Sequence, residues 1–409
     1  MKSRMRITLF ALSALVVIPA AACHRDNQPP SALQSQTRDS AGIRIVENPT
    51  PPAGSRLGWR IGSEPGVSIG RRDGEEPYLL YGAGDATILA DGRILVANGG
   101  SGELRFFDST GSHLATRGGQ GEGPGEFLQL RSLEPWPGDS IVAWYGPRQN
   151  VSVFDNAGNY ARTIEINDAS DPWAWRLAST SVRGSILAVL LLEYADTLVM
   201  ELRDGEGGLR TSLGAHPSWQ PAVLVDEGTE REMQHVPTFA REPVWGMWGD
   251  LAALGVTSRY EIRAYGADGS LARIVRREHG LRVPTPEDVE AYIESRILLY
   301  HADATPSEQE YHRRNYRSAP VAERFAVFTT IMVDELDHLW IREYDHPREE
   351  RPAPLWTVFD PQGHVLGFVE TPAELRMVYE IGEDYILGHS MDELGVEMIQ
   401  VWPLERLVG

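Results

Sequence analysis

The chain has 409 residues, of which 42% are hydrophobic, and it carries a formal net charge of −20 at pH 7. Its length allows two or three average domains, and its hydrophobic content excludes an intrinsically disordered chain. Because nucleic acids and anionic lipid surfaces repel negative charge, both are excluded as partners.

The amino-terminal residues have the order of a bacterial export signal. Lys2, Arg4 and Arg6 precede an apolar run at 7–18, which is too short to span a membrane comfortably. Small residues then lead directly to Cys23, the only cysteine of the chain. This arrangement resembles a lipobox, and the resemblance implies that Cys23 is lipidated and becomes the mature amino terminus. Ordinary signal-peptide cleavage beside an incidental cysteine is the alternative.

We therefore predict a lipoprotein signal peptide at 1–22 and a flexible tether at 23–41. Removing 1–22 takes away three basic groups and no acidic ones, so the charge becomes 35 − 58 = −23. The residue after Cys23 is His24, and no aspartate stands there to favour retention in an inner membrane. We expect a chain in the cell envelope, anchored to the outer membrane and facing the periplasm, with no membrane contact except its lipid.

A weak six-fold repeat runs through the rest of the chain. Each copy pairs two short apolar runs across a tight Gly- or Asp-containing turn, which is typical of an antiparallel hairpin. The copies lie at 86–98, 131–146, 178–191, 244–256, 330–344 and 376–390. Five of them are followed by a second hairpin, so the unit has four strands, the size of one propeller blade.

Six turn positions are equivalent in these copies: Gly92, Gly138, Gly184, Gly249, Asp337 and Glu383. They are spaced by 46, 46, 65, 88 and 46 residues. The two long intervals predict insertions after the third and the fourth blades. We interpret 215–241 as a long loop and 279–319 as two short helices, because Thr-Pro pairs begin two stretches with helical spacing.

The sixth copy lacks its last strand, whereas a spare apolar segment lies upstream at 42–48. Pairing the spare segment with the carboxy-terminal strands would close a ring and remove its exposed edges. We predict an all-β fold over 42–409. It is a six-bladed β-propeller of four-stranded antiparallel blades, closed by an amino-terminal strand, with a helical insertion between blades 4 and 5. We expect a monomer.

Residues 104–127 resemble an NHL-type repeat, in which a hairpin leads into a Gly-rich turn that ends in Gly-x-Phe. As a whole, the chain is similar to the six-bladed, NHL- and TolB-like propeller lipoproteins of bacteria. The resemblance implies a toroid with a funnel, whose loops bind peptides, proteins, sugars or small molecules. Such a fold does not by itself indicate an activity.

The sequence lacks the motifs of the common hydrolases. It contains no His-Glu-x-x-His, no Gly-x-Ser-x-Gly and no Cys-x-x-Cys. Residues 334–338 form the densest group of potential metal ligands, but they occupy a hairpin turn, and His389 with Asp392 is similar. Propeller hydrolases of the gluconolactonase-like group hold calcium in the central channel. Their ligand set does not match here residue by residue, so no cofactor is assigned and Ca²⁺ stays open.

Counting back seven residues from each turn reaches the start of the innermost strand, where side chains face the mouth of the channel. In the third copy the count reaches Leu177, beside an arginine. The candidate ring is Asp85, Arg131, Arg176, Glu242, Thr330 and Arg376. Either these residues form salt bridges that plug the channel, or Arg131 and Arg376 bind a carboxylate or phosphate in bidentate fashion.

Two functions therefore remain. The first is an envelope lipoprotein that binds a protein or a small polar or anionic ligand at its loop face. The second is a metal-assisted, lactonase-like hydrolase with its site in the channel. The absence of every catalytic motif favours binding and leaves no residue assigned to catalysis.

Overall fold

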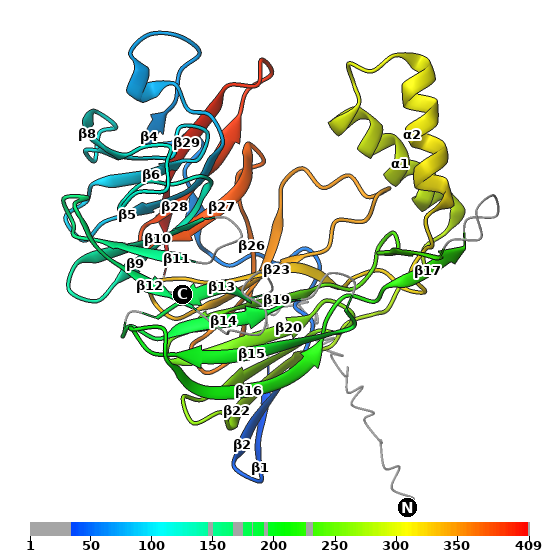
Figure 1. The fold of residues 1–409 in the computed structure, drawn as a ribbon. Coiled ribbons are helices and arrows are strands. Elements are labelled where there is room, and N and C mark those ends of the chain that lie inside the picture. The colour runs from blue at the N-terminus through cyan, green and yellow to red at the C-terminus, as the bar shows by residue number, and fades with distance from the viewer. Residues whose placement is uncertain are drawn as a thin grey trace, which may run out of the picture. The chain divides into compact units, whose positions relative to one another are not determined.

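Six blades, each built on four antiparallel strands, follow one another around a ring in the computed structural model of the chain (Figure 1). The structure describes residues 34–145, 150–166, 175–181, 183–191, 195–225 and 232–407. The predicted six-bladed β-propeller is confirmed. None of the helices in these ranges is long and apolar enough to cross a membrane.

Each blade begins with its innermost strand and proceeds outward. Blade 1 contains β5 (Ala83–Ile88), β6 (Ile94–Asn98), β7 (Glu103–Phe107) and β8 (His113–Gly118). Blade 2 contains β9 (Leu130–Trp136), β10 (Ser140–Tyr145), β11 (Asn150–Phe154) and β12 (Tyr160–Glu165). Blade 3 contains β13 (Trp175–Thr180), β14 (Ile186–Leu190), β15 (Thr197–Arg203) and β16 (Leu209–Pro217).

The second half of the ring has the same order. Blade 4 contains β19 (Pro243–Trp248), β20 (Leu251–Val256), β21 (Glu261–Tyr265) and β22 (Leu271–Arg277). Blade 5 contains β23 (Phe328–Val333), β24 (Leu339–Glu343), β25 (Leu355–Phe359) and β26 (Val365–Glu370). Blade 6 contains β27 (Leu375–Ile381), β28 (Tyr385–Met391) and β29 (Glu397–Glu405), completed by a strand from the amino-terminal part.

An Asp-x-x-Gly turn joins the outer strands of most blades. In blade 1 the Asp108 side chain accepts hydrogen bonds from the backbone of Thr110 and Ser112, while Gly111 adopts a φ of +84°. An aspartate stabilises such a turn because its side chain accepts hydrogen bonds from the backbone N–H groups of the residues that follow it, and glycine takes the positive φ without strain. The same turn begins at Asp155, Asp204, Asp360 and Asp392.

The hydrophobic core is divided among the seams between neighbouring blades. Phe106 and Leu133 lie in the seam of blades 1 and 2, and Trp340 lies in the seam of blades 5 and 6. A single sheet cannot bury both faces alone, so each blade depends on its neighbours and the ring must close.

The ring is closed by β4 (Val67–Ile69), which pairs with β29 together with β3 (Arg60–Ile61). The predicted closure by an amino-terminal strand is therefore confirmed, but the strand is β4 and not the expected segment 42–48. That segment forms β2 (Ile43–Asn48), which runs parallel to β22 at the outer edge of blade 4. Both edges offered unpaired backbone groups, and apolar pattern alone does not tell a strand which edge to join.

The boundary predicted for the tether also needs correction. Residues 36–40, expected to lie in the tether, form β1 (Gln36–Ser40), which pairs with β2 and extends blade 4 to six strands. The signal peptide, Cys23 and the rest of the predicted tether lie outside the described residues.

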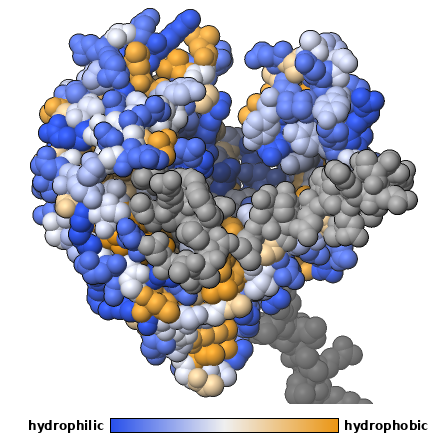
Figure 2. All heavy atoms as spheres, in the orientation of Figure 1, coloured by the Kyte–Doolittle hydropathy of each residue, from blue (hydrophilic) through white to orange (hydrophobic). Residues whose placement is uncertain are grey.

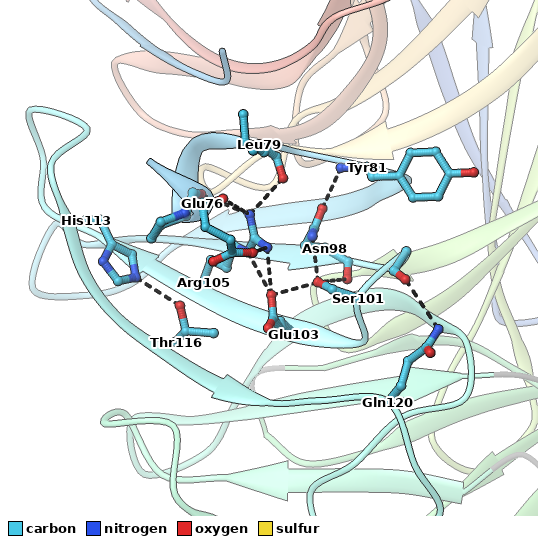
Figure 3. A network of polar contacts seen from close by, with 12 residues as sticks. Glu76, Leu79, Tyr81, Asn98, Ser101, Glu103, Arg105, His113, Thr116 and Gln120 are labelled. Atoms are coloured by element: carbon cyan, nitrogen blue, oxygen red, sulfur yellow. Dashed lines mark hydrogen bonds and ion pairs between the residues drawn. The ribbon is translucent and has the colours of Figure 1, made fainter. Parts of the chain in front are cut away.

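An arginine fixes the segment that leads from the closing strand into blade 1. Arg105 on β7 is buried, and its guanidinium donates to the carbonyl oxygens of Glu76, Pro77 and Leu79, in and after the short 3-10 helix η1 (Glu76–Tyr78) (Figure 3). The same group contacts the carboxylate of Glu103. The ion pair compensates the cost of burying the charge, so this cluster is structural.

Both predicted insertions are present. The one before blade 5 forms α1 (Pro286–Tyr300) and α2 (Pro306–Ser318), as expected. The one before blade 4, expected as a loop, contains a hairpin of β17 (Ala222–Val225) and β18 (Glu232–His235). Both leave from the ends of outermost strands and return to innermost strands, so they lie on the same face of the ring.

Candidate functional site

The innermost strands carry β-bulges near their starts. The pairing with the second strand shifts by one residue in blades 1, 2, 5 and 6. The unpaired second residue of the strand is exposed in each case, and these four residues are Gly84, Arg131, Thr329 and Arg376. Bulges release a side chain from the regular alternation and redirect it, and they often occur next to binding sites.

Arg131 and Arg376 are the two charged members of this set. They lie on β9 and β27, the strands on either side of β5 in the ring. Neither forms an ion pair or a side-chain hydrogen bond within the described part of the chain. Between them Gly84 contributes no side chain, and a Cβ there would lie 2.8 Å from the backbone oxygen of Arg131. The start of β5 therefore packs closely against the backbone of Arg131, and the two exposed guanidinium groups on the neighbouring strands have no ion-pair partner among the described residues.

The other predicted ring residues are placed differently. Asp85 points into the seam with blade 2, where its carboxylate accepts a hydrogen bond of 2.9 Å from the backbone N–H of Leu133. Thr330 is half-buried, one residue after the bulge, and Glu242 is exposed just before β19. Arg176 lies on β13, but its side chain is outside the described residues.

The structure thus brings the two arginines to equivalent positions and separates them from Asp85. No ion pair joins the described members of the predicted ring to one another, so the salt-bridged plug is not observed among them. A bulge shifts the register by one residue, and such a shift moves every side chain to the other face of the strand.

Two further buried carboxyl groups on innermost strands were missed. Glu134 on β9 accepts hydrogen bonds from the hydroxyl and the backbone N–H of Thr180 in blade 3. Glu380 on β27 accepts from the hydroxyl of Thr87 in blade 1. Counting back three or four residues from the turns at 383 and 138 would have found them. Together with Asp85 they link four consecutive blades through side chains.

Burial dominates the electrostatics of these carboxyl groups. It raises the pKa of Glu134 to about 7 and that of Glu380 to about 7, and it raises the pKa of Asp85 well above its usual value. Glu134 and Asp85 also repel each other, which raises the pKa of Asp85 further. With pKa values of about 7, Glu134 and Glu380 are partly protonated at neutral pH.

A second polar contact connects the top of blade 6 to blade 1. The carboxylate of Glu397 accepts hydrogen bonds from the backbone N–H groups of Gly82 and Ala83, and the hydroxyl of Tyr379 donates to the carbonyl oxygen of Ala83. These bonds hold the first residues of β5 in place. The start of β5 is thus fixed directly beside the bulge at Gly84.

The group at 334–338 is a structural turn. Asp334 is buried and accepts hydrogen bonds from the Nε1 of Trp340 and from the backbone and Nδ1 of His338, and it pairs with Arg406 at 2.9 Å. Of the other predicted pair, His389 lies on β28 and Asp392 begins an Asp-x-x-Gly turn.

The described residues do not fit a calcium ion in the channel. No group of three or more acidic, histidine or cysteine residues among them could hold a metal. The carboxyl oxygens of Asp85, Glu134 and Glu380 already accept hydrogen bonds from neighbouring blades. Ca²⁺ needs several converging oxygens, so no reaction step is derived through it.

No family model and no curated protein matches the chain. It is similar in structure to a protein of Bacteroides fragilis described as exported, with 11% identity and a TM-score of 0.49 over 89% of this chain and 100% of the other. It is also similar to a DUF4221 family member from Bacteroides vulgatus, with 10% identity and a TM-score of 0.47 over 85% of this chain and 99% of the other. A calcium-binding regucalcin from Agrobacterium tumefaciens is similar with 12% identity and a TM-score of 0.38, over 80% of this chain and 91% of the other. At these identities and TM-scores, the matches say nothing about ligand or activity.

Proposed function

We propose that the chain is a cell-envelope binding module that holds a small oxyanion, a carboxylate or a phosphate group of its ligand, at the mouth of the ring. The observation that carries the proposal is the pair of bulged, exposed arginines on either side of Gly84, neither of which has an ion-pair or side-chain hydrogen-bond partner in the part of the chain that the structure describes. A guanidinium presents donors in a planar fork that matches both kinds of oxyanion. Two such groups, on the two strands that neighbour β5, suit a ligand with two negative charges.

The position in the fold supports the same function. The bulges lie on the face that carries both insertions, and loops on a rigid scaffold are a common place for binding. The surrounding charge is negative, so the two arginines would be the local attraction for an anion in an otherwise repulsive field. Export and lipid anchoring at Cys23 come from the sequence alone and form part of this proposal.

Calorimetric titration with inorganic phosphate and with citrate tests the proposal. We expect saturable binding that is lost in the double variant Arg131→Ala, Arg376→Ala. Arg314→Ala is the matched control, because Arg314 is an exposed arginine on α2 without a hydrogen-bond or ion-pair partner among the described residues. Equal binding by the double variant and the control would contradict the proposal.

A further inference from the structure

The two inserted helices are capped at their starts and are joined to each other by ion pairs. Thr285 and Thr305 each begin a helix with a complete capping box, which satisfies the first free N–H groups. Between the helices, Arg313 pairs with Glu294 at 2.8 Å, and Arg317 pairs with Glu290 at 2.9 Å. We call residues 286–318 the helical hairpin.

The base of the helical hairpin is attached to the other insertion. Phe239 packs edge-on against Tyr292 of α1 and also contacts Phe325, with ring centroids 5.1 and 4.7 Å apart. The backbone N–H of Thr238 donates to the carbonyl oxygen of Pro320. Above this base the helices stand apart from the sheets, and a hollow separates the two on the visible face (Figures 1 and 2).

The far end of the helical hairpin is apolar and exposed. Leu298, Leu299 and Tyr300 form the last turn of α1 and are 73%, 58% and 58% exposed. Tyr311 on α2 is 55% exposed. These four residues are the hairpin tip. Leucine with tyrosine is the composition found at a membrane–water interface, where the tyrosine hydroxyl stays wet.

The described chain begins at the end of blade 4 from which the helical hairpin leaves. Gln34 and Glu278 line one hollow, and the backbone N–H of Glu278 donates to the carbonyl oxygen of Asn48. Cys23 lies 11 residues before Gln34. A chain of that length spans at most about 40 Å. A helix of 15 residues is about 22 Å long, so a lipid on Cys23 would keep the surface within reach of the tip.

We propose that the hairpin tip inserts into the surface of the membrane to which the chain is anchored, which would be a second membrane contact beside the lipid that the sequence analysis expects to be the only one. Residues 286–318 contain seven acidic and four basic groups, a net charge of −3, so the surface must be an uncharged one. Four side chains bind lipid only weakly, and a tethered lipid supplies the high local concentration that makes weak insertion persist. The insertion would orient the face with Arg131 and Arg376 toward the membrane. It requires the anchor at Cys23 but not the anion site.

Fluorescence of a labelled chain tests this insertion. An acylated Cys23 leaves no free thiol, so Leu299→Cys places an environment-sensitive probe at one position of the full lipidated chain in phosphatidylcholine vesicles. The matched control is Leu209→Cys, because Leu209 is also 58% exposed and begins β16 at the end of the strand far from the insertions. We expect a blue shift and quenching by lipid-borne quenchers at position 299 but not at 209.

Further measurements separate insertion from other contacts. Adding Leu298→Ser and Tyr311→Ser should abolish the shift while the circular dichroism spectrum is retained. The same spectrum at positions 299 and 209 would overturn the proposal, and so would a Cys23 that carries no acyl group. A shift that disappears on dilution to one chain per vesicle would assign the tip to a second copy instead, which also overturns it.

Discussion

The buried carboxyl group of Glu134 should make the stability of the ring depend on pH. Burial raises its pKa in the folded chain from 4.5 to about 7. A group whose pKa is raised in the folded state contributes its full stabilisation of the fold below its unfolded-state pKa. This stabilisation is lost as the pH rises through the folded-state pKa. Folding should therefore weaken between about pH 4.5 and 7.

The size of the effect follows from the two pKa values. Each pKa unit corresponds to about 1.36 kcal/mol, so the 2.5 units between 4.5 and about 7 give at most about 3 kcal/mol above pH 8. Because Glu134 is not fully shielded from water, we expect its charge to lower the free energy of unfolding by about 2 kcal/mol. Glu134→Gln removes the charge but keeps an oxygen that can accept from Thr180 at the 2.6 Å hydroxyl contact.

Urea unfolding of the wild type and of Glu134→Gln at pH 5.5 and 8.5 measures this difference. The variant should equal the wild type within about 1 kcal/mol at pH 5.5 and exceed it by about 2 kcal/mol at pH 8.5. Glu393→Gln, at an exposed turn position, controls for the loss of one negative charge. If the variant gains nothing over this control at the higher pH, the reasoning from burial is refuted.

Three further predictions concern close approaches and ring closure. Gly84→Ala should lower the stability of the fold in thermal melts by about 1–3 kcal/mol, because the new Cβ would meet the backbone of Arg131. The control Gly246→Ala has open space around it and should be neutral or stabilising in the same melts. Glu343→Ala should cost about 3–5 kcal/mol in urea unfolding because it leaves the buried Arg277 unpaired, and adding Arg277→Met should recover most of that loss. Ile69→Ala should cost about 2–5 kcal/mol, since the buried Ile69 belongs to the closing strand, and an unchanged unfolding midpoint would argue against closure by β4.

The fold could be predicted because its signals are local and repeated. Turns with Asp and Gly and apolar runs of strand length occur six times, and each repeat confirms the others. The strand that closes the ring could not be predicted in the same way. Residues 43–48 form the longer strand, with three apolar side chains against two in 67–69, yet the shorter segment pairs with β29. Partner choice depends on which edge lies within reach in three dimensions, and no local pattern encodes that.

The ring of candidate residues was predicted only in part, for a related reason. Arg131 and Arg376 are themselves the bulged, exposed residues of β9 and β27, whereas Asp85 and Thr330 each follow a bulged residue. A bulge adds one residue to a strand without changing its apolar pattern. Counting from a turn therefore finds the right strand and misses the right face by one position. Glu134 and Glu380 lay beyond the count, because it addressed only the starts of the strands.

A crystal structure of the protein soaked with selenate tests the central claim most directly, because selenium can be located by its anomalous signal. The account predicts a selenate in contact with the guanidinium of Arg131, of Arg376 or of both, beside Gly84. The contrary result is a structure in which these guanidinium groups pair with carboxylates of the protein, or in which selenate binds only elsewhere.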